Sequence, residues 1–440
     1  MDQNSVDTSA GEPAGYRLGP LQMAGGVRRS HINGLFFVAF FAVPIVGFVG
    51  LVQPFVLTEI LKIPFDEQGS LTGNLLVMHE LINLSLIGVY GAASDKLGRR
   101  GVLATALTMV AIGYCLFPIV TGQPELVIFR VLVALGVGGV SAMVTAVAND
   151  YPVEICRARM IAVVFIFNGL GLAILPRIFG GLPAWFIDSG YGANQAAAYA
   201  FLVVAGVAIM VALVAVTRLK KGAPRQSSKK DPLLGTLKVG FRAMRNPRVA
   251  LAYAAGLVSR GDLSVASTFL TLWLVSEGVK SGLTAADALK QATLIYIVIQ
   301  ASALPWAAVL GYVLDRIDRV VGLMAAMLIA AVGYGSFALL EDPLSNWIYP
   351  CAALVGLGEM AALLSAMSLV GKESPDKGRG AVMGVFSMFG AAGIMLTGLG
   401  GGYLFDNWRP VGPFVLVASA NIVLFFVAAA ILIFSRKQQA

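Results

Sequence analysis

Long apolar runs recur along this chain of 440 residues and leave it few folds to adopt. A helix needs about 20 mostly apolar residues to cross roughly 30 Å of hydrocarbon. Inside lipid, each backbone polar group must find its hydrogen-bond partner within the protein, so such runs are helices. The sequence therefore predicts an all-α membrane protein with twelve transmembrane helices. The expected spans are 33–59, 70–93, 101–120, 124–149, 160–186, 197–217, 249–276, 287–313, 320–340, 346–370, 381–405 and 413–434.

The composition supports a membrane protein and argues against other classes. Only 13% of the residues are charged and 58% are hydrophobic, whereas a soluble domain carries about 25% charged residues. The net charge of +8 resides in short loops between apolar runs, which favours a topology signal over nucleic-acid binding. Three scattered cysteines and two histidines predict neither a disulfide framework nor a metal site.

The loop charges predict the orientation in the membrane. Basic residues are expected on the cytoplasmic side, and here they gather at both termini, after the even-numbered spans and in the loop 218–248. Both termini are therefore expected in the cytoplasm, and the chain in a cytoplasmic (inner) membrane. Residues 1–32 are polar and basic, without the apolar stretch of a cleaved signal peptide. The opposite loops hold few cations: Lys62, Lys280, Lys290 and Arg409.

The loop 218–248 is the longest and most basic of the chain. Its first part, Ala223 to Lys230, is typical of a flexible linker. Its second part, Pro232 to Arg245, is predicted to form an amphipathic helix along the inner leaflet. We interpret this helix as a membrane anchor, with a partner-binding helix as the alternative.

An internal repeat divides the chain into two halves. The polar turn Gly91–Arg100 has a copy at Gly311–Arg319, and Asp315 follows Asp95 by half the length of the chain. Arg379 follows Arg159 by the same offset. Parallel repeats of this kind are a transporter architecture with the substrate site between the halves. The expected division is a cytoplasmic segment 1–32, a six-helix bundle 33–217, a basic linker 218–248, a six-helix bundle 249–434 and a cytoplasmic tail 435–440.

The repeated turn resembles a signature of the major facilitator superfamily of secondary transporters. The resemblance rests on Gly91, Asp95, Lys96, Gly98, Arg99 and Arg100. Arg130–Gly139 resembles the second signature of this superfamily, and Asn149–Pro152 with Arg157 and Arg159 is similar to proton-coupled porters of organic and aromatic acids. Gly171–Gly181, which contains Pro176, is loosely similar to the fifth-span motif of proton antiporters. The resemblance implies two pseudo-symmetric six-helix bundles, alternating access and a self-sufficient monomer.

The two polar turns are predicted to form a gate on the cytoplasmic side. Gly98 is expected at positive φ, and Gly91 would let two helices approach closely. We expect Asp95 to cap the N-terminal end of the eleventh span near Ala381 in the outward-open state. Arg99 would pair with Asp150. The alternative is that these charges only set topology. The candidate gate residues are Gly91, Asp95, Gly98, Arg99, Arg100, Asp150, Arg159, Asp315, Arg316, Arg319 and Arg379.

Charged residues inside the spans are candidates for substrate binding and proton coupling, because each costs about 2.5–3.5 kcal/mol on insertion. Carboxylates in a low-dielectric site can exchange protons near neutral pH, while arginine stays charged and would hold an anionic group. Neutralisation of Arg260 by Asp262 is the alternative, but residues two apart face different sides of a helix. The candidates are Glu80, Arg260, Asp262, Glu359, Arg177 and Arg130.

The sequence therefore predicts a secondary active transporter that moves a small organic solute, anionic or amphipathic, coupled to protons. The alternatives are a proton antiporter that exports hydrophobic compounds and a non-transporting membrane receptor. No Walker motif is present, so we expect neither an enzyme nor a primary pump, and no cofactor beyond the proton gradient. The expected partners are the small-molecule substrate, the proton and the lipid bilayer, with no nucleic acid.

Asp95→Asn tests the gate. The substitution removes the charge that would face the helix N-terminus, so we expect a changed balance of inward-open and outward-open states and slower uptake. Spin-label distances and solute uptake into proteoliposomes measure the two effects. A variant that matches the original protein in both measurements would contradict the gate hypothesis.

Overall fold

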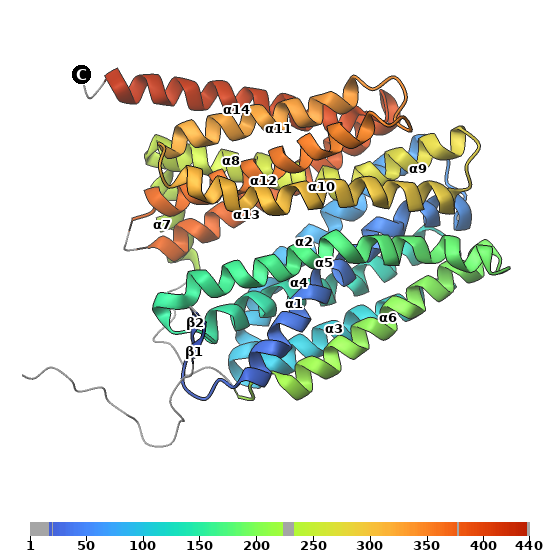
Figure 1. Ribbon diagram of the computed structural model, residues 1–440, viewed down its shortest axis with the longest axis horizontal. Helices are drawn as coiled ribbons and strands as arrows, with labels where there is room; N and C mark the ends of the chain where they lie inside the picture. The colour runs from blue at the N-terminus through green and yellow to red at the C-terminus, as the bar shows by residue number, and fades with distance from the viewer. Residues whose placement is uncertain (1–16, 20, 223–232, 376–377, 438–440) are drawn as a thin grey trace, which may run out of the picture.

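The computed structural model describes residues 17–19, 21–222, 233–375 and 378–437 (Figure 1). The expected linker Ala223 to Lys230 lies outside the described residues. The elements of the first half are β1 (Arg17–Leu18), β2 (Leu21–Gln22), α1 (Arg29–Phe55), η1 (Val56–Ile60), α2 (Phe65–Leu97), α3 (Arg99–Leu116), η2 (Phe117–Ile119), α4 (Gln123–Asp150), η3 (Glu154–Cys156), α5 (Arg157–Asp188) and α6 (Ala193–Arg218). Those of the second half are α7 (Leu233–Arg242), η4 (Ala243–Arg245), α8 (Pro247–Ser264), η5 (Val265–Phe269), α9 (Leu270–Lys280), α10 (Ala285–Leu314), α11 (Arg319–Ala338), α12 (Ile348–Glu373), α13 (Arg379–Asn407) and α14 (Gly412–Lys437).

The helices coincide with the predicted spans. In the described part of the chain, eleven helices are long and apolar enough to cross a membrane. The expected span 249–276 is not among them. It is a continuous helical stretch made of α8, the π-helical turn η5 and α9, and α8 carries Arg248, Arg260 and Asp262. The all-helical membrane fold is confirmed, while the count of twelve spans stays a prediction.

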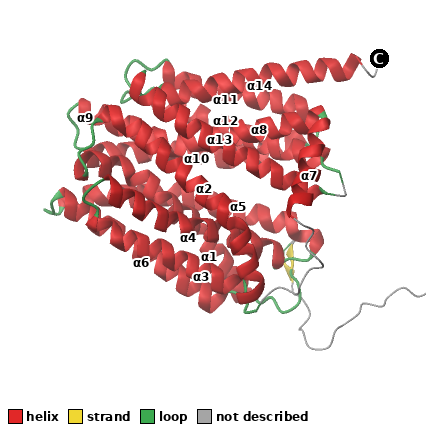
Figure 2. Cartoon of the chain, turned by 180° about the vertical axis from the view of Figure 1, so that it is seen from behind, coloured by secondary structure: helices red, strands yellow, loops and turns green. Residues whose placement is uncertain are grey.

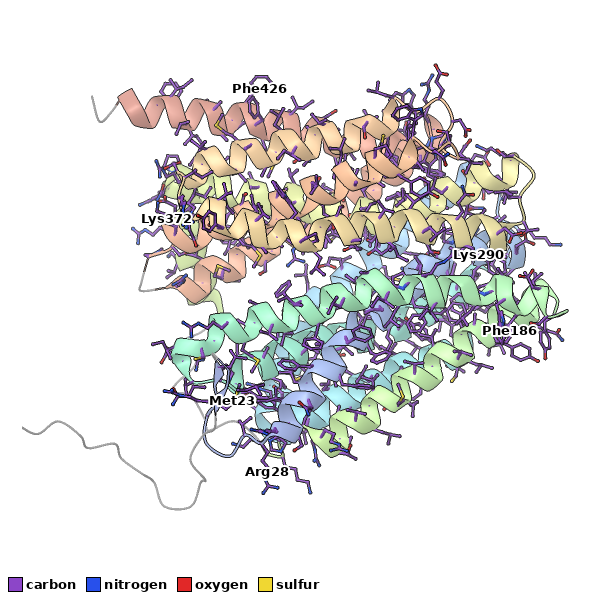
Figure 3. The ribbon with its side chains drawn as sticks, in the orientation of Figure 1. Met23, Arg28, Phe186, Lys290, Lys372 and Phe426 are labelled. Atoms are coloured by element: carbon purple, nitrogen blue, oxygen red, sulfur yellow. The ribbon has the colours of Figure 1, made fainter. Side chains whose placement is uncertain are left out.

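Two helical layers form the molecule (Figures 1 and 2). Helices α1 to α6 lie in one layer, and α8 to α14 lie in the other. A large hydrophobic cluster lies inside each layer, one drawn mainly from residues before Leu219 and one from residues after Val249. The start of α1 and the end of α14 lie at the same end of the molecule, called here the terminal end. Met23 and Arg28 mark this end, and Phe186 and Lys290 mark the opposite, distal end (Figure 3).

The described residues before α1 pack against the first bundle. Strands β1 and β2 pair antiparallel, Met23 bridges to Pro152, and the Ala24 amide donates to the Tyr151 carbonyl at 2.9 Å. Burial raises the pKa of Tyr151 to about 12, so its hydroxyl stays neutral and accepts a bond from the Lys220 amide. The N-terminal segment and the end of α6 are thereby tied to the turn after α4.

Helices α2 and α13 join the two layers through glycines. A Cβ added to Gly73 would lie 2.1 Å from the Gly398 carbonyl oxygen, and one added to Gly402 would lie 2.5 Å from the Gly69 oxygen. Each helix thus presents two glycines four residues apart, the spacing that lets membrane helices touch through their backbones. No larger residue fits here without separating the helices.

Polar bonds reinforce this junction at the distal end. The amides of Gly69 and Ser70 donate to the two carboxylate oxygens of Asp406 at 2.7 and 2.6 Å. Arg177 of α5 donates to the Lys290 carbonyl of α10 at 2.8 Å. Bonds to a charged group are stronger than neutral ones. The two layers are therefore fastened together at the distal end.

Gly73→Ala should loosen the distal junction. The new methyl group meets backbone rather than a flexible side chain, and overpacking of this kind costs about 1–3 kcal/mol. We expect the population of the state closed at the distal end to fall about fivefold or more relative to the open state. Spin labels at Glu67 and Asn407, both exposed helix-end residues, should report longer distances.

Gly88→Ala is the matched control on the same helix, because a Cβ at Gly88 meets nothing within 4 Å. Its distance distribution should equal that of the original chain. Equal distributions for both variants would show that the glycine contact does not hold the junction.

Candidate functional site

The predicted ion pair of the gate is present. Arg99 Nε lies 3.0 Å from Asp150 Oδ2, and Arg99 Nη1 lies 3.2 Å from Asp95 Oδ1. Arg99 also donates to the Ser94 hydroxyl. Gly98 has φ of +85°, as predicted, because the chain reverses between α2 and α3 without an intervening loop. The arginine thus ties the end of α2 to the end of α4.

The expected role of Gly91 is wrong in this structure. A Cβ added there meets nothing within 4 Å, because the close approach of α2 and α13 occurs at Gly69 and Gly73, near the distal end. Asp95 bonds Arg99 of its own half. Its capping of α13 near Ala381 belongs to the other conformational state and stays a prediction.

The second copy of the turn keeps the acid–base pair but closes differently. Arg319 Nη2 lies 3.0 Å from Asp315 Oδ1, while the Arg316 guanidinium covers the Tyr312 ring at 3.3 Å from its centroid. Asp318 caps α11 by accepting from the Val320 amide at 2.8 Å. The turn is therefore held by a side-chain cap where the first copy uses a glycine at positive φ.

Arg248 lies at the same end of the molecule as the gate residues, and the sequence did not identify it as one of them. Its Nη1 lies 3.2 Å from Glu373 Oε1 and 3.6 Å from Asp318 Oδ2, so it ties α8 to α12 and to the turn before α11. Arg159 and Arg379 lie exposed in the first turns of α5 and α13, and Arg100 is partly buried at the start of α3. The expected roles of these three arginines stay predictions.

Two of the intramembrane charges lie on different bundles, near enough to attract each other but without a direct ion pair. Glu80 lies near the middle of α2, and Arg260 lies near the middle of the α8–η5–α9 stretch. Arg260 is exposed and Glu80 partly exposed, and Asn83 lies beside the Glu80 carboxylate. This pair is called here the interbundle pair. It places opposite charges on the two sides of the boundary between the bundles, called here the divide.

Asp262 and Glu359 lie together inside the second bundle. Asp262 is 0% exposed, and Asn421 Nδ2 lies 3.0 Å from both of its carboxylate oxygens. Tyr334 donates to the Asp262 carbonyl at 2.8 Å and also contacts the Glu359 carboxylate, as does Gln300. Asp262, Glu359, Tyr334, Asn421 and Gln300 are called here the enclosed cluster. The expectation that Arg260 and Asp262 face different ways is confirmed, since one is exposed and the other buried.

The charges of the two carboxylates in the enclosed cluster interact. Among the described residues, no basic side chain forms an ion pair with either, and Glu359 Oε2 lacks a hydrogen-bond partner. A π-helical turn, Val265–Phe269, follows Asp262 directly. Such turns are frequent at functional sites. The three candidate carboxylates therefore divide into one at the interbundle pair and two in the enclosed cluster.

The remaining arginines have separate surroundings. Arg130 is 6% exposed and lies near His79 and Tyr114 within the first bundle, and its Nε has no partner among the described residues. Arg177 donates one hydrogen bond to the Lys290 carbonyl across the divide. Neither lies in the interbundle pair or the enclosed cluster, so the structure favours structural ties for both.

Sequence reasoning missed Asn421, Tyr334 and Asp406. Asn421 is a polar residue within an apolar span, so the criterion that selected Glu359 could also have selected it. The role of Asp406 depends on the distant amides of Gly69 and Ser70, and no local pattern indicates that contact. In the described part of the chain, no three His, Cys, Asp or Glu side chains come together as metal ligands.

These features define a multi-pass helical membrane protein built from two bundles, with charged groups where the bundles meet. The sequence profile of the Major Facilitator Superfamily matches residues 35–396, and the chain belongs to this superfamily. Membership indicates a transporter rather than an enzyme.

Known proteins of similar sequence are magnetosome proteins. The chain is 25% identical to magnetosome protein MamH of Paramagnetospirillum magneticum, over 90% of this chain and 91% of MamH. It is 24% identical to magnetosome protein MamZ of the same organism, over 86% of this chain and 59% of MamZ, so it spans about three fifths of that protein. Among solved structures, the nucleoside transporter NupG superposes with a TM-score of 0.73 at 15% identity, over 91% of this chain and 98% of NupG.

Asn421→Ala should destabilise the protein. It removes the donor that serves both oxygens of a fully buried carboxylate, and an unsatisfied buried group costs about 1–3 kcal/mol, more when charged. We expect the melting temperature of the detergent-solubilised protein to fall by several degrees. Asn407→Ala is the control, since exposed Asn407 donates only to a carbonyl of its own helix. Equal melting temperatures for the two variants would contradict the importance of the enclosed cluster.

Proposed function

We propose that the protein is a proton-coupled secondary transporter that moves a small anionic or amphipathic organic solute by alternating access. The observation that carries the proposal is the interbundle pair. It sets Arg260 and Glu80 on opposite sides of the divide, near mid-length of their helices, with the layers fastened at the distal end. A solute site between two rocking bundles is the arrangement typical of this transporter architecture.

Arg260 is the proposed substrate-binding residue. An arginine stays charged and presents a planar donor set that matches a carboxylate or phosphate. Arg260 is exposed at the divide, and the negative charge that acts on it there is that of Glu80. An anionic solute would therefore compete with Glu80 for Arg260 and weaken the attraction between the bundles. That competition links binding to the relative position of the two halves.

The enclosed cluster is the proposed proton site. Two negative charges near each other in a dry interior are costly without a cation, so one of Asp262 and Glu359 is suited to holding a proton. Asp262 lies two residues from Arg260 on α8, and the π-helical turn follows it. A shift of α8 on solute binding would reach both the arginine and the cluster.

The conformation is consistent with alternating access. With the basic loops in the cytoplasm, the terminal end is the cytoplasmic end and the fastened distal end faces away from it. The structure then corresponds to an inward-facing state. Return to the outward-facing state requires the glycine contact of α2 and α13 to part and the gate to close at the other end.

Proteoliposomes with an internal pH indicator test the proposal. Solute addition should change internal pH in the original protein, and Asp262→Asn and Glu359→Gln should abolish this change while keeping solute exchange. Symport and antiport separate by the direction of the change. Arg260→Gln should raise the KM for an anionic solute about tenfold or more, because a hydrogen bond to a charged group contributes about 1.5–3 kcal/mol.

Glu67→Gln is the control, because Glu67 is an exposed residue at the distal start of α2. It should leave both the pH signal and the KM unchanged. Proton coupling is wrong if Glu80→Gln, Asp262→Asn and Glu359→Gln all retain the pH signal. The anion site is wrong if Arg260→Gln retains the original KM.

A further inference from the structure

Helix α7 and the turn η4 carry a shallow, open surface pocket outside the proposed transport site. The pocket has a volume of about 640 Å³ and is lined by Lys238, Phe241, Arg242, Met244 and Arg245. Three of the five lining residues are cations and none is acidic. Lys238, Arg242 and Arg245 form no ion pair with a described acidic side chain, and all three are exposed. The three positive charges are therefore available to a ligand.

The helix is held in place from its other side. A Cβ at Gly240 would lie 2.5 Å from the Ala381 carbonyl oxygen of α13, and buried Tyr253 of α8 donates to the Gly240 carbonyl at 3.0 Å. Leu237 and Met244 pack against the core of the second bundle. Leu237 and Gly240 lie on α7 and Met244 lies on the following turn η4, so one side of this segment is committed to protein contact.

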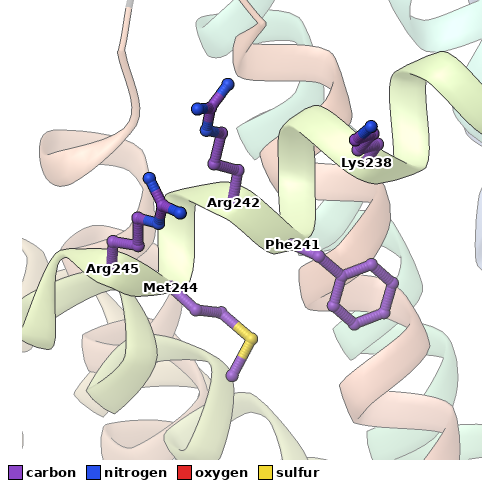
Figure 4. A pocket seen from close by; sticks show the side chains of 5 residues that line it. All are labelled: Lys238, Phe241, Arg242, Met244 and Arg245. Atoms are coloured by element: carbon purple, nitrogen blue, oxygen red, sulfur yellow. The ribbon is translucent and has the colours of Figure 1, made fainter.

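The neighbouring face combines charge with apolar surface. The cationic side chains project to one side of the segment and Phe241 projects to the other (Figure 4). Phe241 is 45% exposed and Val239 is 47% exposed. A site for a free anion needs no exposed aromatic residue, whereas a segment at a lipid surface buries such residues among acyl chains and keeps its cations at headgroup level.

The position of the segment agrees with a lipid surface. Helix α7 packs on the first turns of α13 and leads through η4 into α8, so it lies where two spans begin at the terminal end (Figure 1). We propose that the pocket binds the headgroup of an anionic phospholipid from the leaflet at this end, with the phosphate held by Lys238, Arg242 and Arg245. The inference does not depend on the identity of the solute or on proton coupling.

The site has a mechanical consequence. A lipid held there fixes α7 against both the membrane and the starts of α8 and α13, the helices that carry Arg260 and the distal glycine contact. The second bundle would then pivot from an anchored end during transport. Anionic lipid is therefore expected to stabilise the folded protein.

Thermal unfolding of the full-length, delipidated protein in detergent tests the proposal. Short-chain phosphatidylglycerol should raise the melting temperature, and short-chain phosphatidylcholine and inorganic phosphate should not. Each basic residue near an anionic surface strengthens binding about fivefold. K238Q/R242Q/R245Q should therefore need about a hundredfold more phosphatidylglycerol for the same stabilisation.

Two variants control for charge loss and misfolding. R157Q/K221Q/K372Q removes three exposed cations of the terminal end that do not line the pocket and should respond to phosphatidylglycerol within about threefold of the original. R242K/R245K keeps the charges and should retain most of the response. The proposal is overturned if the pocket triple variant responds like the original, if both triple variants lose the response equally, or if inorganic phosphate stabilises as well as the lipid.

Discussion

The backbone contact between α2 and α13 is the constraint on which the rest of the structure depends. Gly69 and Gly73 meet Gly398 and Gly402 with no side chain between them, so the backbones of the two bundles touch on the distal side. Small residues allow this in lipid because association there relies on close packing rather than on a hydrophobic driving force. The Asp406 carboxylate adds charge-assisted bonds at the same place. A contact of this kind is either formed or parted, which suits a molecule with two states.

The burial of individual side chains separates the charged residues into two kinds of site. Arg260 and Glu80 remain accessible at the divide, whereas Asp262 and Glu359 are enclosed by Tyr334, Asn421 and Gln300. In the proposed function the solute binds at the first pair and the proton at the second. Because Arg260 and Asp262 belong to one helix, movement of α8 acts on both sites. Helix α7 precedes α8 and docks on α13, so the proposed lipid site would be linked to the same elements.

Much of the fold was predictable because helix formation in lipid is a local requirement. The twelve predicted runs all coincide with helical stretches, and most of the observed helix ends lie within a few residues of the predicted ones. The prediction of positive φ at Gly98 was also local, since α2 ends and α3 begins around that one residue. The prediction of the Arg99–Asp150 pair also required the assumption that successive helices lie side by side. The prediction for Gly91 was wrong because it depended on which end of α2 touches the other bundle.

The sequence by itself determined the helices, the number of membrane spans to an accuracy of one, and the residues that carry charge into the membrane. These features are local, because the insertion cost and the hydrogen-bond requirement act on each segment separately. The sequence did not determine which charges meet. Asp406 reaches Gly69 and Ser70, and Asn421 reaches Asp262, across more than a hundred positions of the chain. Only the tertiary structure decided these contacts, because they follow from how the faces of separate helices converge.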